Sequence, residues 1–187
     1  MKAVLFDIGA GNLHSLERAL VRFGVSVSVE ADATKLTQAD LLILPGVGAF
    51  GHAAERLAPG RAAVREALEA GLPCIGICLG MQLLFDESEE GPGAGLGLLP
   101  GRVTRLRGRR VPHLGWTPVG DDRFYFAHTY ACRPVDPAAV EAWAEHEGER
   151  FPAIVRKGRT AGAQFHPEKS SKAGLALLER LVREVTS

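Results

Sequence analysis

Cys78 is the residue best placed to act as a nucleophile. It lies in residues 76–80, Gly-Ile-Cys-Leu-Gly, where an apolar run enters a segment with helical spacing. A tight strand-to-helix corner requires small residues two positions before and after its nucleophile. At the start of a helix, the dipole and free amides favour the reactive thiolate, and the Leu79 N–H can stabilise an oxyanion. The alternative is a structural cysteine, since free cysteines are often buried.

A thiolate nucleophile needs a base and a group that orients the base, and residues 164–168, Gln-Phe-His-Pro-Glu, can supply both. Pro167 cannot continue regular strand pairing, so the chain must turn there. The turn keeps Glu168 near enough to hold the His166 imidazole in one tautomer. A surface His and Glu beside a turn is the alternative. Among the other histidines, His113 and His128 lie in segments distinctive enough to compete as bases.

A glycine-rich segment, residues 45–50, follows the apolar run 41–44. In an open α/β sheet, sites lie outside the carboxyl ends of the strands, where this segment and Cys78 both fall. Glycines let backbone N–H groups turn toward a ligand, so Val47 and Gly48 are candidate oxyanion donors. A simple tight turn is the alternative. The spacing fits neither the dinucleotide-binding fingerprint nor the P-loop.

The elements around these motifs predict an α/β fold: an open, mostly parallel central sheet flanked by helices, with antiparallel strands added in the second half. Apolar runs separated by helical segments are typical of a parallel sheet covered on both faces. The parallel strands are expected at 2–8, 25–29, 41–44 and 73–77. Helices are expected at 13–23, 61–70, 79–85 and 170–185. Little helix separates the later strands, which predicts antiparallel additions at the sheet edge, at 102–106, 123–127, 140–145 and 151–156, followed by one more strand at 160–165.

The composition is that of one ordinary globular domain over residues 1–187, with 46% hydrophobic and 24% charged residues. Because 22 basic side chains balance 22 acidic ones, no strong attraction to nucleic acid or to an anionic membrane is expected. No apolar run approaches the roughly 20 residues that span a bilayer. Three cysteines, an odd number without metal-ligand spacing, predict a reducing cytoplasmic location and no metal or other cofactor.

Taken together, the motifs resemble the class I glutamine amidotransferases, which carry a Gly-x-Cys-x-Gly elbow, an upstream Pro-Gly-rich oxyanion loop and a late His-Pro-Glu segment. The match is closest to one branch of that class, the glutaminase subunits of imidazole glycerol phosphate synthase, an enzyme of histidine biosynthesis. The segments that carry the resemblance span nearly the whole chain: 7–12, 45–50, 76–84, 111–116, 124–130 and 164–171. The resemblance implies a flavodoxin-like fold and a single type-1 amidotransferase domain.

The resemblance also implies a role for each matching residue. Cys78 would attack the side-chain amide of glutamine and become a glutamyl thioester, while His166 moves the proton to ammonia and Glu168 orients His166. The implied oxyanion donors are the backbone groups of Val47, Gly48 and Leu79. The implied substrate-binding residues are Gln82, Glu90, Thr129 and Tyr130. The implied partner-sensing residues are Asn12 and Lys169.

Ammonia released into neutral water is protonated and loses its nucleophilic lone pair, so a biosynthetic glutaminase must pass it directly to a second site. The chain carries no nucleotide- or phosphate-binding fingerprint of its own. By resemblance, the acceptor is a (β/α)8 cyclase subunit in a heterodimer, which makes imidazole glycerol phosphate and aminoimidazole carboxamide ribonucleotide. Residues 45–49 are a candidate switch, because their glycines permit a peptide to reorient, and weak activity without the partner is expected.

Three other functions compete with this interpretation. Within the same fold, the chain could be the glutaminase subunit of pyridoxal phosphate synthase. A thiol esterase or peptidase could use the same elbow, although α/β-hydrolases place the acid before the histidine and here Glu168 follows His166. A binding module that has lost its chemistry is the third alternative, and the intact Cys78, His166 and Glu168 weigh against it.

Overall fold

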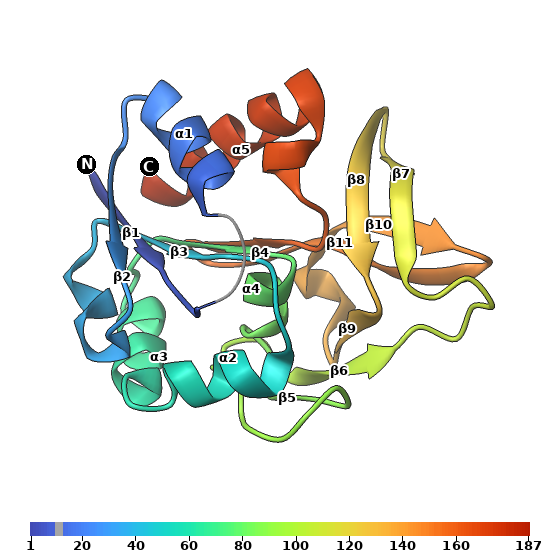
Figure 1. The fold of residues 1–187 in the computed structure, drawn as a ribbon, viewed down its shortest axis with the longest axis horizontal. Helices are drawn as coiled ribbons and strands as arrows, with labels where there is room; N and C mark the ends of the chain where they lie inside the picture. Colours follow the sequence, from blue (N-terminus) through green and yellow to red (C-terminus); the bar gives the residue numbers. More distant parts are fainter. Residues whose placement is uncertain (10–12) are drawn as a thin grey trace.

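A seven-stranded central sheet organises the computed structural model, which describes residues 1–9 and 13–187 (Figure 1). The strand order is β10-β11-β12-β4-β3-β1-β2. Five of these strands run parallel to one another: β1 (Lys2–Phe6), β2 (Ser26–Glu30), β3 (Leu41–Leu44), β4 (Cys74–Ile77) and β12 (Thr160–Ala163). Two antiparallel strands complete one edge, β11 (Glu149–Lys157) and β10 (Val140–His146). The expected mostly parallel α/β sheet is confirmed.

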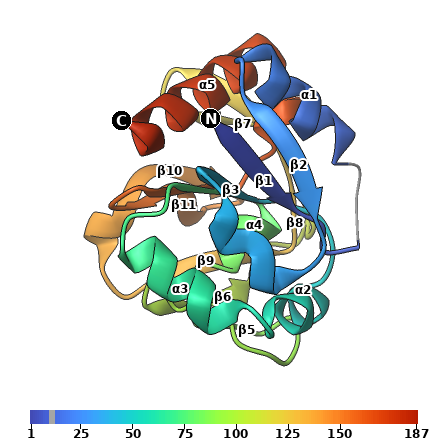
Figure 2. The ribbon, with the colours of Figure 1, turned by 90° about the vertical axis from the view of Figure 1, so that its left-hand side faces the viewer.

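Helices cover both faces of this sheet (Figures 1 and 2). One face packs against α1 (His14–Arg22) and α5 (Ser171–Thr186), and the other against α2 (Phe50–Leu57) and α3 (Arg61–Glu69). Successive strand residues point to opposite faces, so along β1 Ala3 and Leu5 enter one core cluster while Val4 and Phe6 enter the other. Burial on both faces explains the uninterrupted apolar runs of β3 and β4. Helix α2 was not expected from the sequence.

The second half also builds two small sheets. A three-stranded sheet joins β5 (Glu87–Ser88), β6 (Gly101–Arg105) and β9 (Tyr130–Pro134), and a hairpin joins β7 (His113–Val119) to β8 (Asp122–His128). The expectation that segments 102–106 and 123–127 extend the central sheet was therefore wrong. Each pairs instead with a strand that the sequence did not reveal, β9 or β7. Segments 140–145 and 151–156 do lie at the central sheet edge, as expected.

Short helical segments connect the strands: η1 (Ala33–Gln38), α4 (Leu79–Gln82), η2 (Pro137–Ala139) and η3 (Pro167–Lys169). The four residues of α4 form only the beginning of the helix expected over 79–85. In the described ranges 1–9 and 13–187, no helix has both the length and the apolar character needed to cross a membrane.

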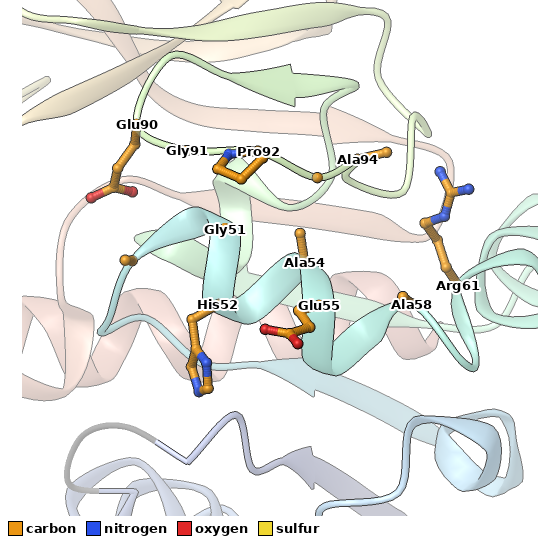
Figure 3. A pocket seen from close by; sticks show the side chains of 12 residues that line it. Gly51, His52, Ala54, Glu55, Ala58, Arg61, Glu90, Gly91, Pro92 and Ala94 are labelled. Carbon is orange, nitrogen blue, oxygen red and sulfur yellow. The ribbon is translucent and has the colours of Figure 1, made fainter.

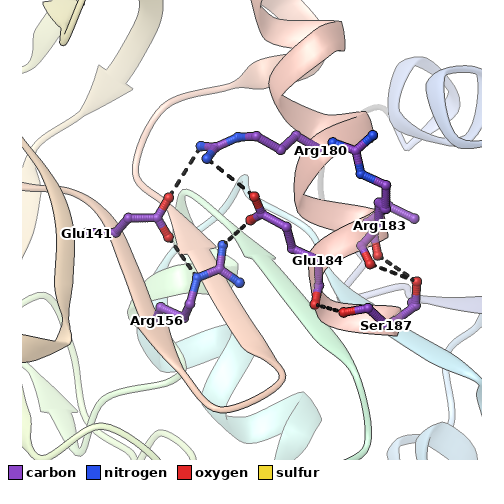
Figure 4. Close-up of polar contacts among 8 residues, drawn as sticks. Glu141, Arg156, Arg180, Arg183, Glu184 and Ser187 are labelled. Atoms are coloured by element: carbon purple, nitrogen blue, oxygen red, sulfur yellow. Dashed lines mark hydrogen bonds and ion pairs between the residues drawn. The ribbon is translucent and has the colours of Figure 1, made fainter.

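An ion-pair network ties the end of α5 to the edge strands (Figure 4). The Arg156 guanidinium reaches the carboxylates of Glu141 at 2.7 Å and Glu184 at 2.6 Å, and Arg180 reaches the same two carboxylates at 3.3 and 3.4 Å. Arg156 is paired with Ala161 near the start of β12, so the network lies at the amino edge of the parallel strands. Such partly exposed pairs each contribute little, but a network of them holds α5 in place.

Candidate active site

Cys78 occupies a strained corner between β4 and α4. Its backbone angles are φ 50° and ψ −102°, a conformation that residues other than glycine rarely adopt. The flanking glycines make the corner possible: a Cβ on Gly76 would lie 2.6 Å from the carbonyl of Gly80, and a Cβ on Gly80 would lie 1.9 Å from the carbonyl oxygen of Leu44. The tight strand-to-helix turn expected at Cys78 is confirmed.

The glycine-rich segment after β3 packs directly against this corner. A Cβ on Gly46 would lie 2.2 Å from the carbonyl oxygen of Ile77 and 2.9 Å from the Cβ of Cys78. Gly48 has φ 118°, in the region that favours glycine. At Gly46 the segment therefore approaches the corner more closely than a residue with a side chain would allow. Val47 and Gly48 border the same cavity as Cys78.

His166 follows β12, the neighbour of the strand that leads into Cys78. Its Nδ1 lies 2.9 Å from Oε1 of Glu168, and His166 and Cys78 line the same cavity. Burial alone would lower the pKa of His166, but the hydrogen bonds and negative charges of Cys78 and Glu168 outweigh it and raise the pKa to about 10. The raised pKa favours a protonated imidazole next to the Cys78 sulfur.

The backbone around His166 is fixed by β8. The His166 N–H donates to the Tyr125 carbonyl at 2.9 Å, and the Tyr125 N–H donates to the Ser170 hydroxyl at 2.9 Å. That hydroxyl in turn donates to the His166 carbonyl at 2.6 Å. Pro167 opens η3, which turns the chain and returns Glu168 toward the imidazole. A hairpin far away in the sequence thus holds the ring against Cys78.

The competing histidines have a different setting. His113 Nδ1 lies 3.0 Å from His128 Nε2, and His113 Nε2 lies 2.7 Å from the Thr117 hydroxyl. Burial lowers the pKa of His128 to about 3, and burial together with the charge of His146 lowers that of His113 to about 4. Neither ring is oriented by a carboxylate in the described part of the chain, in contrast to His166. They form a neutral pair, of which His128 lines the cavity.

A cavity of about 250 Å³ opens at the sulfur and brings the predicted residues together. Cys78 and His166 line it, as do the predicted oxyanion and substrate residues Val47, Gly48, Leu79, Gln82, Glu90, Thr129 and Tyr130. The exposed Lys169 stands at its border, and Glu168 lies just behind His166. Asn12 lies outside the described residues. The size of the cavity suits a small polar molecule.

Two of the lining side chains have their polar atoms partly engaged. Gln82 Nε2 donates both to the Tyr130 carbonyl at 3.0 Å and to Gln164 Oε1 at 3.3 Å, which leaves the Gln82 carbonyl oxygen as its contact for a ligand. Glu90 Oε2 accepts the Phe50 N–H at 2.8 Å, which fixes the carboxylate at the start of α2. Both groups can therefore accept hydrogen bonds from an ammonium group.

Gln164 is a member of the site whose role was not predicted from the sequence. It is fully buried, and its Nε2 lies 3.5 Å from the Cys78 sulfur. The available signal was a single amide-bearing residue at the end of the otherwise small and apolar run 160–165. That signal alone does not distinguish a partner of the nucleophile from a satisfied core residue.

A larger cavity, of about 680 Å³, lies beside the first, between α2 and residues 90–94 (Figure 3). Glu90 stands at one end and Arg61 at the other, and alanines and glycines line much of the space between them. Glu90 borders both cavities, but Cys78 and His166 border only the smaller one. Size therefore does not identify the reactive site, whereas the pairing of a thiol with an imidazole does.

Comparison with known proteins agrees with this geometry. Residues 4–185 match the family model for class-I glutamine amidotransferases. The chain is 46% identical to the imidazole glycerol phosphate synthase subunit HisH of Thermus thermophilus, over 95% of both chains. It is 39% identical to HisH of Pyrococcus furiosus, over 97% of this chain and 98% of that one. A glutamine amidotransferase crystal structure has the same fold, with a TM-score of 0.77 at 22% identity over 98% of both chains. The chain belongs to the class-I glutamine amidotransferases and, within them, to the HisH subunits of imidazole glycerol phosphate synthase.

Proposed function

We propose that the chain hydrolyses L-glutamine to glutamate and ammonia and delivers the ammonia to a cyclase subunit. The cyclase would use it to form imidazole glycerol phosphate and aminoimidazole carboxamide ribonucleotide in histidine biosynthesis. The observation that carries the proposal is the placement of Cys78 beside His166, whose imidazole is held by Glu168, in the lining of one small cavity. The names of the HisH relatives support the biosynthetic role.

The geometry supports a two-stage mechanism. The Cys78 thiolate attacks the side-chain amide carbon, and His166 then donates its proton to the amide nitrogen as the C–N bond breaks and ammonia leaves. Neutral His166 next takes a proton from a water molecule, whose oxygen attacks the thioester and breaks the C–S bond to release glutamate. Glu168 accepts the Nδ1–H throughout, which keeps Nε2 directed at the reaction.

Charge develops on the carbonyl oxygen in both stages. The Leu79 amide is the first of α4, and the segment containing Val47 and Gly48 lies against the sulfur, so these backbone groups are the proposed oxyanion donors. The Gln82 carbonyl oxygen and the Glu90 carboxylate would accept hydrogen bonds from the substrate ammonium group, with Thr129 and Tyr130 as the adjoining wall.

The surface around the cavity mouth supports the proposed (β/α)8 cyclase partner and a heterodimer. Leu114 and Trp116 project from β7 with 64% and 46% of their surface exposed, and Leu114 lines the cavity itself. Apolar side chains exposed beside a reactive cavity are suited to being covered by another protein. We propose Lys169, at the border of the cavity, and Asn12 as the residues that sense the partner.

Two further proposals concern the number of domains and the cellular location of the chain. We treat residues 1–187 as one amidotransferase domain, because a single sheet serves both core clusters and the family model extends over residues 4–185. We propose a cytoplasmic location, because the three cysteines are free thiols and a reducing compartment keeps them so.

Glutamate release by matched cysteine variants tests the proposal. Wild-type protein should release glutamate slowly alone and faster with the cyclase subunit and its ribonucleotide ligand. Cys78→Ala should lose hydrolysis under both conditions and keep its circular dichroism spectrum, because only the nucleophile is removed. Cys74→Ala should retain hydrolysis, since Cys74 is buried in the core. Turnover by Cys78→Ala would refute the mechanism, and an equal rate with and without the partner would refute gating by residues 45–49.

A further inference from the structure

A buried chain of polar side chains begins at the nucleophile and continues away from the reaction. The parallel register pairs Ala163 of β12 with Ile77 of β4, so the residues that follow them, Gln164 and Cys78, emerge side by side. The Cys78 N–H donates to the Ala163 carbonyl, and the Gln164 N–H donates to the Ala153 carbonyl at 2.9 Å. These backbone bonds fix the spacing of the two side chains, whose Nε2 and Sγ atoms lie 3.5 Å apart.

We propose that Gln164 directs an N–H at the Cys78 sulfur, stabilises it as the thiolate and aims it into the cavity. The inference rests on Cys78 being the nucleophile of the proposed function, and it adds a second donor to the one supplied by His166. An amide donor differs from the imidazolium because it cannot transfer its proton to the sulfur. It therefore stabilises the anion without competing to neutralise it.

The orientation of the Gln164 amide follows from a backbone atom. The Tyr130 carbonyl can only accept, so the group of Gln82 that lies 3.0 Å from it must be the NH2 group. The same Gln82 nitrogen lies 3.3 Å from the Gln164 side chain and donates its second hydrogen there. Gln164 must therefore present its oxygen to Gln82 and its NH2 group to Cys78.

A second chain of donors ends at the same carbonyl. His128 Nδ1 lies 2.8 Å from the Tyr130 oxygen and must carry a hydrogen to bond it, so His128 Nε2 accepts from His113 Nδ1. His113 Nε2 then accepts from the Thr117 hydroxyl. The two donors occupy both lone pairs of the Tyr130 oxygen, which prevents Gln82 from turning and, through Gln82, keeps the Gln164 donor directed at the sulfur.

The choice of acceptor indicates a role beyond packing. A fully buried amide nitrogen gains most from a carbonyl or carboxylate acceptor, whereas a thiol sulfur is a weak one. A thiolate, in contrast, is an anion and makes a charge-assisted hydrogen bond. The hydrogen bond from Gln164 is therefore stabilising mainly when Cys78 is ionised, which is the state that attacks the substrate.

The pH dependence of Cys78 alkylation tests this role without glutamine. In the variant Gln164→Met, which has a similar size but no donor, the alkylation midpoint with iodoacetamide should rise by about one pH unit, because a hydrogen bond to a charged group is lost. Mass spectrometry of the Cys78 peptide excludes signal from Cys74 and Cys132. The variant retains the titratable neighbours of the sulfur, His166 and Cys132, and His128 further along the network.

Two further variants make the result decisive. Thr160→Val removes a buried polar side chain at the other end of β12 and should leave the midpoint unchanged. Gln82→Met frees the Gln164 amide to turn and should raise the midpoint by a smaller amount, which gives a test even if Gln164→Met does not fold. An unchanged midpoint in the folded Gln164 and Gln82 variants, or an equal rise in Thr160→Val, would overturn the inference. Failure of the glutaminase proposal would appear separately, as an alkylated Cys78 without glutamate release.

Discussion

A cysteine lies at each end of β4, Cys74 at its first residue and Cys78 just after its last, and the two have opposite settings. Cys74, at the amino edge, is fully buried, and burial raises the pKa of its thiol far above the ordinary value. Cys78, just beyond the carboxyl end of the same strand, sits at a strained corner, contacts His166 and opens on a cavity. Two identical side chains four positions apart thus differ because the sheet has two unlike edges.

The surroundings of the two cysteines, at the amino edge and the carboxyl edge of the parallel strands, also differ. At the carboxyl edge, three separate chain segments converge on the sulfur: residues 45–49, the corner at Cys78 and residues 164–169. At the amino edge, the turn after β11 and the end of α5 are held by backbone bonds and by the ion pairs of Arg156. One edge positions reactive groups and the other maintains the fold. Matched substitutions at the two ends of the parallel strands test this division.

The largest difference is expected between two glutamates. Glu168→Gln keeps a side chain of the same size beside His166 but removes the charge that stabilises the imidazolium, so kcat for glutamine hydrolysis should fall on the order of 10²- to 10⁴-fold. Glu184→Gln, in the amino-edge network, should leave kcat unchanged and alter the free energy of unfolding by less than about 1 kcal/mol. Hydrolysis with the cyclase subunit and urea unfolding measure the two effects. Similar losses of activity in both variants would contradict the division.

An intermediate difference is expected between two glycines. Gly80→Ala would place a Cβ 1.9 Å from the Leu44 carbonyl oxygen and should lower the free energy of unfolding by about 3 kcal/mol. Gly158, in the turn between β11 and β12, has φ 55° and open space around it, so Gly158→Ala should cost only about 1 kcal/mol from backbone strain. Urea unfolding of both variants provides the comparison. A cost at Gly80 no larger than that at Gly158 would mean that the corner tolerates a side chain.

The smallest expected effect is a loss of folding stability at acidic pH. His113 and His128 stay neutral in the folded protein, with pKa values of about 4 and about 3, whereas in the unfolded chain they take up protons near pH 6.5. The unfolded state therefore binds more protons between about pH 3 and pH 6.5, so the free energy of unfolding falls as the pH is lowered through that window. Replacing His128 with Gln should reduce the loss between pH 7 and pH 5 by about 2 kcal/mol. An unchanged pH dependence in urea unfolding would refute this.

The sequence revealed the elements whose environment is uniform along their length. Residues 41–44 are apolar throughout because both faces of β3 are buried, and the predicted bounds are those of the strand. β7 was missed because it contains Gly115 and Pro118 and exposes Leu114 and Trp116, so its identity as a strand comes from pairing with β8. α2 was missed because it is short, carries a glycine in its first turn and has no capping side chain at Ala49.

The same distinction separates the predicted and unpredicted parts of the site. The corner at Cys78 is encoded by adjacent glycines, so a local pattern was enough to predict it. That His166 reaches Cys78 depends on segments 88 positions apart in the sequence. Residue types alone made His166 one candidate base among three histidines, and the resemblance then favoured it. The contact of Gln164 with the sulfur depends on the register between β12 and β4, which no local pattern specifies.

The Tyr130 carbonyl belongs to the main chain, so any residue type at position 130 provides the same oxygen. Replacing the phenol ring would reshape the cavity wall and yet leave the two donors from Gln82 and His128 with their acceptor. The molecule can therefore adjust which small molecules fit at this position without disturbing how its reactive sulfur is held. Ligand preference and nucleophile geometry can evolve independently here, within a single residue.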